Sequence, residues 1–231
     1  MELLSLNQLK FKYPDSERGR LEIKHFHVSK GEKIFLFGPS GSGKTTFLEL
    51  LAGVLTPASG SIKIDGTDLA TLSNTSRDAF RADYIGYIFQ SFNLIPYLSV
   101  IENIALPLSL SSKRRQHVPK NQELTKIQSV AKRLGILDLL DHKTSELSVG
   151  QQQRVAAARS LIGHPKLILA DEPTSALDFD HREKFLNLIF DICKEQSISL
   201  IFVSHDRSLQ GLFDRVVALA DLNEIKNGSA Q

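Results

Sequence analysis

Hydrophobic positions in the first part of the chain form short runs that are typical of strands. Two such runs occupy residues 2–13 and 21–28, on either side of a polar turn from Pro14 to Gly19. A third run, Ile34 to Phe37, leads directly into a glycine-rich loop, and a helical pattern follows from Thr45 to Val54. The pattern therefore predicts strands first and a helix immediately after the glycines.

The rest of the chain divides into a helical part and a second group of strands. Strand-like runs at 60–64 and 85–89 precede a helical pattern over residues 91–163. Apolar runs then return between helical patterns, at Leu167 to Ala170, Ser199 to Val203 and Val216 to Leu219. Buried parallel strands joined by crossover helices have this pattern. The sequence predicts one α/β domain over residues 1–231, with antiparallel strands at its start, a helical insert at about 91–163 and a loose tail from Lys226.

Length, charge and cysteine content indicate which classes of protein the chain can belong to. The chain has 231 residues, enough for one large domain with a substantial core, and its 28 basic and 26 acidic residues give a formal charge of +2. This balance argues against an electrostatic nucleic-acid binder. The single cysteine, Cys193, excludes an intrachain disulfide and lies in a helical apolar pattern, so we expect it to be packed. We find no apolar run long enough to span a bilayer and no leader pattern at Met1, so we expect a cytosolic chain.

The glycine-rich loop carries the first recognisable chemistry. Residues 38–45 read Gly-Pro-Ser-Gly-Ser-Gly-Lys-Thr, which fits the phosphate-binding pattern and has the required strand before it and helix after it. Its glycines let backbone N–H groups point at phosphates, and the helix N-terminus adds positive charge. We expect Lys44 to reach the β and γ phosphates and Thr45 to ligate Mg²⁺.

Two further segments point to the same site or to a second phosphate contact. Asp171 and Glu172 follow a run of four apolar residues, so Asp171 should project from the carboxyl end of a buried strand and hold Mg²⁺, directly or through water. The segment Leu147-Ser148-Val149-Gly150-Gln151 is predicted to begin a helix at Ser148 and Gly150, with its positive end available to a phosphate.

Taken together, these segments resemble the ATP-binding-cassette (ABC) ATPases. An LSxGQ segment about twenty residues before an acidic pair is typical of that family, and six elements occur in the family's order: Tyr13, residues 38–45, Gln90, residues 147–151, the Asp171-Glu172 pair and His205. The resemblance implies a P-loop NTPase fold with an antiparallel β subdomain, a RecA-like core and a helical subdomain. It also implies ATP and Mg²⁺ as ligands.

The resemblance further implies roles for individual residues. Glu172 is expected to act as the general base, with His205 orienting the attacking water and contacting the γ phosphate. Gln90 is expected to join Thr45 and Asp171 at Mg²⁺. Tyr13 is expected to stack on adenine, with Phe11 as the alternative if the register differs. The nucleotide-binding residues implied are Tyr13, Gly38, Pro39, Ser40, Gly41, Ser42, Gly43, Lys44, Thr45, Thr46, Gln90, Ser148, Gly150 and Gln151.

Partners follow from the same resemblance. In this family the LSxGQ segment completes the site of the opposite subunit, which implies an ATP-dependent head-to-tail homodimer in which residues 175–178 lie at the interface. Val149 stands where glycine is usual, and we interpret it as a tolerated change. Residues 87–96, 102–108 and 150–154 are similar to ATPases of the lipoprotein-releasing and macrolide-exporter group, which work with a separate permease on the cytoplasmic face of the inner membrane.

The docking surface for such a permease is expected near Gln90 to Leu98, which is rich in large apolar residues, with packing of the helical insert as the alternative role of these residues. Lipophilic or peptide-like cargo, or mechanical work across an envelope, would fit this group. The alternatives are a soluble ABC ATPase acting on ribosomes or DNA, and a P-loop kinase, which has no use for the LSxGQ segment. The basic cluster Lys113-Arg114-Arg115 is predicted to be a solvated loop without a function.

Overall fold

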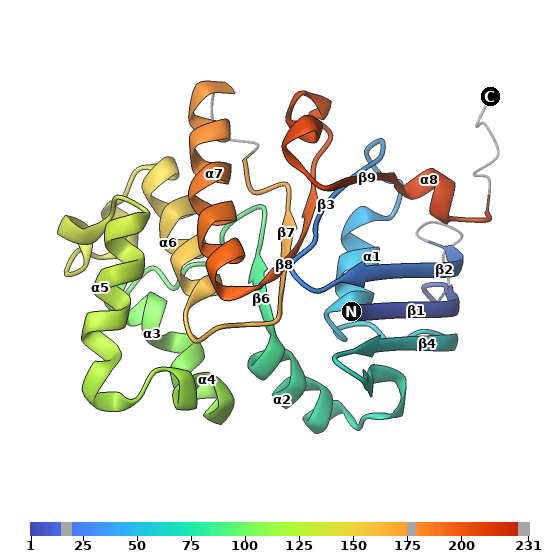
Figure 1. The fold of residues 1–231 in the computed structure, drawn as a ribbon, viewed down its shortest axis with the longest axis horizontal. Helices are drawn as coiled ribbons and strands as arrows, with labels where there is room; N and C mark the ends of the chain where they lie inside the picture. The colour runs from blue at the N-terminus through green and yellow to red at the C-terminus, as the bar shows by residue number, and fades with distance from the viewer. Residues whose placement is uncertain (15–19, 175–178, 226–231) are drawn as a thin grey trace.

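Two sheets and a group of helices make up the molecule in the computed structural model, which describes residues 1–14, 20–174 and 179–225 (Figure 1). The antiparallel sheet has the strand order β2-β1-β4-β5 and the parallel sheet the order β6-β7-β8-β3-β9. The first contains β1 (Glu2–Phe11), β2 (Leu21–Ser29), β4 (Ser59–Ile64) and β5 (Thr67–Asp68). The second contains β3 (Lys33–Phe37), β6 (Ile85–Ile88), β7 (Leu167–Asp171), β8 (Ser199–Val203) and β9 (Arg215–Ala218). The predicted fold class is confirmed.

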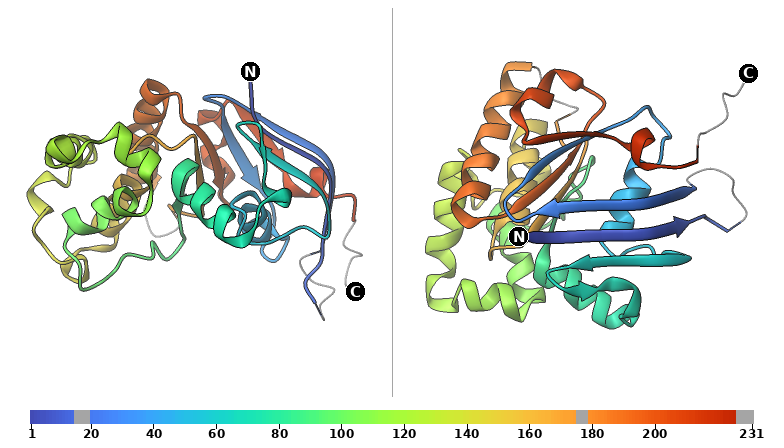
Figure 2. Two further views of the ribbon diagram at one scale, coloured as in Figure 1. Left: turned by 90° about the horizontal axis from the view of Figure 1, so that it is seen from below. Right: turned by 45° about the vertical axis from the view of Figure 1, so that its right-hand side comes forward.

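Helices lie between the sheets and at the end of the molecule opposite the antiparallel sheet (Figure 2). They are α1 (Lys44–Leu51), α2 (Asn74–Tyr84), α3 (Val100–Leu110), α4 (Ser112–His117), α5 (Glu123–Arg133), α6 (Val149–Leu161), α7 (Phe179–Gln196) and α8 (Leu219–Leu222). One-turn 3-10 segments lie at Leu69–Thr71, Lys120–Gln122, Leu137–Leu139 and Thr144–Glu146, and a longer one at Arg207–Leu212. Within these residues, no helix is both long enough and apolar enough to cross a membrane.

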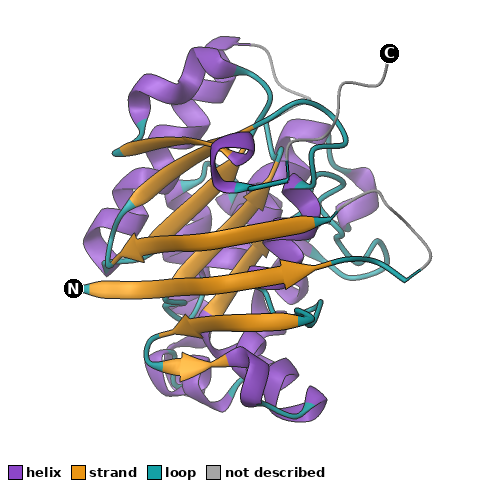
Figure 3. Cartoon of the chain, turned by 90° about the vertical axis from the view of Figure 1, so that its right-hand side faces the viewer, coloured by secondary structure: helices purple, strands orange, loops and turns teal. Residues whose placement is uncertain are grey.

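Alternation along the parallel strands divides the interior into two cores. Successive side chains of a strand point to opposite faces, so a strand that is buried on both sides feeds two hydrophobic clusters. Ile168 and Leu200 pack in the cluster that contains α6 and α7, whereas Leu169 and Ile201 pack in the cluster that contains α1 and the antiparallel sheet. Figure 3 shows the antiparallel strands in front of the parallel ones, with helices behind them. The parallel sheet is therefore the central layer of the molecule.

The structure changes several predicted boundaries. Strand β1 ends at Phe11 rather than at residue 13, β6 ends at Ile88, and Leu219 begins α8 instead of ending a strand. Helix α2 was not predicted, because its sequence is mostly polar and only Arg77 and Phe80 are buried in it. Cys193 is packed as expected, and burial raises the pKa of its thiol to about 12.

The prediction of a solvated loop for the basic cluster was wrong, because all three residues lie in the short helix α4 and the central one is buried. Arg114 is 2% exposed, although Lys113 is exposed and Arg115 is half-buried. Its guanidinium donates hydrogen bonds to backbone carbonyl groups of three surrounding segments. This burial could not be predicted from the residue pattern, because the partners are main-chain atoms brought together by the fold.

The close packing of β6 against the end of α6 can be tested at Gly86. A Cβ atom at residue 86 would lie 2.3 Å from the carbonyl oxygen of Ser160, so the strand and helix would have to separate. Gly86→Ala should lower the free energy of unfolding by about 1 to 3 kcal/mol, the usual cost of overpacking. Gly211→Ala is the control, because a Cβ there meets no atom within 4 Å. Equal denaturation midpoints for the two variants would contradict the close approach.

Candidate nucleotide site

The loop between β3 and α1 turns tightly because two of its glycines adopt left-handed backbone conformations that other residues avoid. Gly41 and Gly43 have φ angles of 76° and 98°, in the left-handed region. A Cβ on Gly38 would lie 2.7 Å from the Ser42 hydroxyl oxygen, so a larger residue at the first position would force the Ser42 side chain to move. The loop ends at the N-terminus of α1, whose unpaired N–H groups and partial positive charge suit a phosphate.

Lys44 lies across this loop. Its ammonium group donates hydrogen bonds of 2.9 Å and 3.0 Å to the carbonyl oxygens of Gly38 and Pro39. The same nitrogen lies 3.7 Å from Oε1 of Glu172. A buried lysine held in this way places its charge over the mouth of the loop, where a phosphate chain would pass.

Thr45 and Asp171 bring the loop and β7 together. The Thr45 hydroxyl donates a 2.8 Å hydrogen bond to Oδ2 of Asp171, at the carboxyl end of that strand. Asp171 is buried, and this desolvation raises the pKa of its carboxyl, while the Thr45 hydrogen bond acts in the opposite direction. The two side chains stand where the sequence predicts a magnesium site.

A polar cavity of about 310 Å³ opens between these groups. Its walls are formed by Ser40, Gly41, Gly43, Lys44, Thr45, Thr46, Gln90, Asp171 and Glu172. The hydroxyl, amide and carboxylate oxygens of Thr45, Gln90 and Asp171 are the hard ligands that Mg²⁺ prefers, and their small number suits an ion that keeps several waters. The residues present therefore fit Mg²⁺ bound with a nucleotide phosphate chain.

Glu172 and His205 meet beside the cavity. β7 and β8 are paired in parallel with Asp171 opposite Val203, so the residues after both strands leave the sheet at the same edge. His205 Nδ1 lies 2.9 Å from Oε2 of Glu172. Glu172 has a φ angle of 44°, a left-handed conformation that costs a non-glycine residue about 1 to 3 kcal/mol, and its N–H donates to the carbonyl of Val203. Such strain is typical of residues held for a function.

Tyr13 and Phe11 occupy different environments at the end of β1. Phe11 is buried and pairs with Leu21 across the sheet. Tyr13 lies past the end of the strand, with its ring edge against Phe11 and its hydroxyl 3.4 Å from the Thr46 hydroxyl. Because Thr46 lines the cavity, the geometry favours Tyr13 over Phe11 as the aromatic residue near a bound nucleotide.

The LSVGQ segment lies apart from this cavity. Ser148 is the N-cap of α6: its hydroxyl accepts a hydrogen bond from the N–H of Gln151, whose side chain accepts one from the N–H of Ser148. Ser148, Gly150 and Gln151 are not among the residues that line the cavity. Val149 is 50% exposed at the start of the helix, so its side chain does not distort the cap. Residues 175–178, which were predicted to lie at a subunit interface, are outside the described part of the chain.

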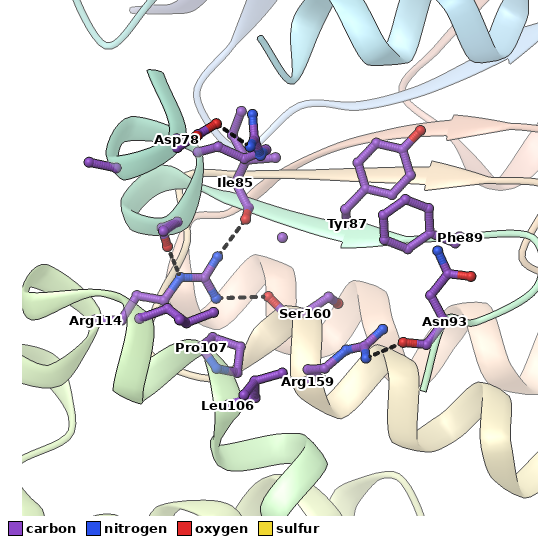
Figure 4. A pocket seen from close by; sticks show the side chains of 15 residues that line it. Asp78, Ile85, Tyr87, Phe89, Asn93, Leu106, Pro107, Arg114, Arg159 and Ser160 are labelled. Atoms are coloured by element: carbon purple, nitrogen blue, oxygen red, sulfur yellow. Dashed lines mark hydrogen bonds and ion pairs between the residues drawn. The ribbon is translucent and has the colours of Figure 1, made fainter. Parts of the chain in front are cut away.

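A second opening, a groove of about 530 Å³, lies where α2, α3 and the last turn of α6 approach β6 (Figure 4). Sequence reasoning missed most of its residues, which come from segments far apart in the chain. It is lined by Asp78, Ala79, Arg81, Ala82, Ile85, Gly86, Tyr87, Phe89, Asn93, Leu106, Pro107, Leu110, Arg114, Arg159 and Ser160. Apolar side chains and guanidinium groups therefore share one groove.

The apolar segment after Gln90 only borders this groove. Phe92 is buried in the core, and Leu94 and Ile95 are half-buried, so Tyr97, at 75%, is the widely exposed large side chain there. Arg159 of α6 donates to the carbonyls of Phe92 and Asn93, both of which have positive φ angles. The expectation that some large apolar side chains of this segment are exposed therefore holds for Tyr97, whereas Phe92 packs in the helical part of the molecule.

Comparison with known proteins gives consistent matches. The family model described as ABC transporter matches residues 21–175. The chain is 42% identical over 179 residues to the ABC transporter ATP-binding protein YtrE of Bacillus subtilis, covering 78% of this chain and 75% of that protein. It is 37% identical over 194 residues to the lipoprotein-releasing system ATP-binding protein LolD of Porphyromonas gingivalis, covering 84% and 86%. Among solved structures, the dimeric ATP-binding cassette MJ0796 bound to ADP and Pi has a TM-score of 0.81 at 33% identity and covers 94% of each chain.

Replacement of Lys44 tests the phosphate contact. Lys44→Ala should weaken ATP binding by about 10 to 150 fold, the equivalent of a charged hydrogen bond, because the loop's backbone groups remain. Lys63→Ala, an exposed lysine on β4, is the control. Titration with a fluorescent ATP analogue measures both. Unchanged affinity in the Lys44 variant would show that the nucleotide does not bind across this loop.

Proposed function

The chain belongs to the ABC transporter family and is an ABC ATPase that acts on ATP with Mg²⁺, and from this premise we propose that it is the motor subunit of a membrane complex. One observation carries the proposal. The phosphate loop and the acidic end of β7 meet at one cavity with His205 beside it, whereas the LSVGQ helix, with its positive end, does not line this cavity. A capped helix terminus that does not line the chain's own cavity fits two copies that complete each other's sites.

Hydrolysis is assigned to the residues around the cavity. Glu172 takes the proton of the attacking water, and its contact with His205 Nδ1 supports a role for the histidine in orienting that carboxylate and the water. Lys44 stabilises charge on the transferred phosphoryl group. Mg²⁺, when bound, supplies further positive charge against the phosphate oxygens. These assignments use side chains that already lie in contact with one another.

The second copy supplies the LSVGQ helix. Ser148, Gly150 and Gln151 would face the γ phosphate held by the partner's loop, and two-fold symmetry would repeat the arrangement. The capping box leaves N–H groups of the first turn of α6 available for such an anion. The dimer described for the cassette MJ0796 supports the same assembly here. ATP would therefore act as part of the interface.

The groove at α2, α3 and β6 is the proposed contact with a permease. It is concave, and its apolar wall includes Leu106, Pro107 and Leu110, the last of which is 68% exposed. An amphipathic helix from a membrane partner fits such a groove. The groove also adjoins Phe89, next to Gln90, so movement of a docked helix would reach the nucleotide cavity through one residue. Of the segment at residues 90–98, only the part that borders the groove at Asn93 belongs to the proposed contact.

The relatives suggest the kind of cargo and the place of action. LolD proteins, whose name assigns them to lipoprotein release, are among the similar proteins, with identities of 35% to 39%. We propose a lipophilic or peptide-like cargo, or mechanical work on the envelope, with this subunit held on the cytoplasmic face of the inner membrane by its permease. Action on ribosomes or DNA is not favoured, since the charge is balanced.

The base assignment is tested by Glu172→Gln. Loss of the base should lower turnover by about 10² to 10⁴ fold while ATP binding persists, because the amide keeps the shape of the side chain. Gln90→Ala should behave differently: loss of a Mg²⁺ ligand should raise the Mg²⁺ concentration needed for half-maximal ATPase activity. Steady-state ATPase assays with parallel binding titrations measure these effects. Turnover at the parental rate in the Glu172 variant would remove the residue from its catalytic role.

The docking assignment is tested by Leu110→Asp. A charge on the apolar wall of the groove should abolish sedimentation of the chain with membrane vesicles of its source cell, yet spare ATP binding. Leu124→Asp is the matched control, since Leu124 is 54% exposed on α5, outside the groove. If the Leu110 variant still sediments with the membranes as the parent does, the groove is not the contact.

A further inference from the structure

Among the residues that the structure describes, Arg114 is the most deeply buried charged side chain that the nucleotide chemistry does not use. It comes from the short helix α4 and points inward between α2, β6 and the last turn of α6 (Figure 4). Its guanidinium forms part of the floor of the groove, although it is only 2% exposed. A charge is costly to bury unless it is fully hydrogen-bonded, so its partners need to be identified.

The partners of Arg114 are four backbone carbonyls at the ends of secondary-structure elements. Nε donates to Ala82 at 2.8 Å and Nη2 to Ile85 at 2.6 Å, at the junction of α2 and β6. Nη1 donates to Ser160 at 3.4 Å and Ile162 at 2.9 Å, at the end of α6. These carbonyls belong to the carboxyl ends of two helices, where intrahelical donors run out and the helix dipole is negative.

The charge is therefore balanced by two helix termini. Burial lowers the pKa of Arg114 to about 10, and nearby Asp83 acts against the shift, so the guanidinium stays protonated at neutral pH. Asp83 is also linked to the start of α4, because it accepts a hydrogen bond from Ser111, whose hydroxyl caps the Arg114 N–H.

Two glycines show independently that the elements meet closely at this point. A Cβ on Gly86 of β6 would lie 2.3 Å from the Ser160 oxygen. A Cβ on Gly163, just after α6, would lie 2.6 Å from Cβ of Arg114, and Gly163 has a φ angle of 77°. The strand, the helix end and the arginine thus occupy a junction with no room for an added methyl group.

The two elements joined at this junction carry functional residues at their other ends. β6 leads to Gln90 at the nucleotide cavity, and the 13-residue helix α6 begins just after Ser148. A helix of that length is about 20 Å long, so a tilt of roughly 5° at its carboxyl end moves its N-terminus by about 2 Å. A misplacement of 1 Å can lower a rate by about 10² fold.

We propose that Arg114 is a positioning residue that fixes the end of α6 against the start of β6 and thereby aims Ser148 at the partner's nucleotide. This inference rests on the proposed shared site. Loss of Arg114 should leave ATP binding to the chain's own loop intact, because that loop contacts neither α4 nor the end of α6 through the hydrogen bonds described. It should instead weaken ATP-dependent dimerisation and lower kcat while KM stays nearly constant.

The test compares variants of the full chain by sedimentation with ATP, in a Glu172→Gln background that holds the nucleotide. Arg114→Gln should weaken the dimer at least about tenfold while the Kd for a fluorescent ATP analogue, measured on the monomer, changes less than about twofold. Arg115→Gln is the neighbour control: Arg115 lies on the same helix and pairs with Glu123 nearer the surface. It should leave both quantities unchanged.

A second control separates positioning from loss of stability. Val28→Ala removes buried volume in the antiparallel sheet and should lower Tm without weakening the dimer. Arg114→Lys keeps the charge with three donors, so it should give a dimer of intermediate strength even if the Gln variant does not fold. If the Arg114 variants dimerise as strongly as the parent, or if Val28→Ala weakens the dimer as much as they do, the inference is overturned. A Glu172→Gln parent that fails to dimerise with ATP would overturn the proposed shared site itself, and the inference with it.

Discussion

The hydrogen bond from Thr45 to Asp171 is the contact on which the nucleotide site depends. It joins residues 126 positions apart in the sequence, at the start of α1 and the end of β7. The two segments can meet because β7, β8 and β3 are neighbours in a parallel sheet, with Asp171 and Leu36 both in register with Val203. Parallel strands end at one edge, so the phosphate loop, the acidic pair and His205 gather there without any long irregular connection.

The parallel sheet also connects the cavity to the groove at α2, α3 and β6 and to helix α6. Strand β6 starts at the junction held by Arg114 and ends two residues before Gln90 at the cavity. Helix α6 runs from that junction to the capped terminus at Ser148, which does not line the chain's own cavity. In the proposed dimer, one strand and one helix would therefore connect the groove proposed for a membrane partner with the two halves of a shared nucleotide site. In the proposed complex, rigid-body rotation of these elements would carry movement between the groove and the nucleotide site.

Much of the site was predictable because its chemistry is local in sequence. A phosphate loop needs a strand, glycines, Lys44, Thr45 and a helix in one short stretch, and all of these are adjacent in the chain. The environment of Arg114 could not be predicted in this way, since its partners are main-chain oxygens from segments 29 to 48 residues distant. Which of the large apolar residues after Gln90 are exposed was also not predictable, because Phe92 and Tyr97 are similar in sequence and only the packing of the core buries Phe92 and leaves Tyr97 exposed.

The central claim is that each nucleotide site is built from two copies of the chain, and mixing two inactive variants tests it most directly. Lys44→Ala damages the loop half of a site, and Ser148→Arg damages the helix half. A mixed dimer then contains one site with both defects and one site with neither. An equimolar mixture should regain about a quarter of the parental ATPase rate, because half of its dimers are mixed and each has one intact site. A rate no higher than the mean of the two separate variants would contradict the shared site.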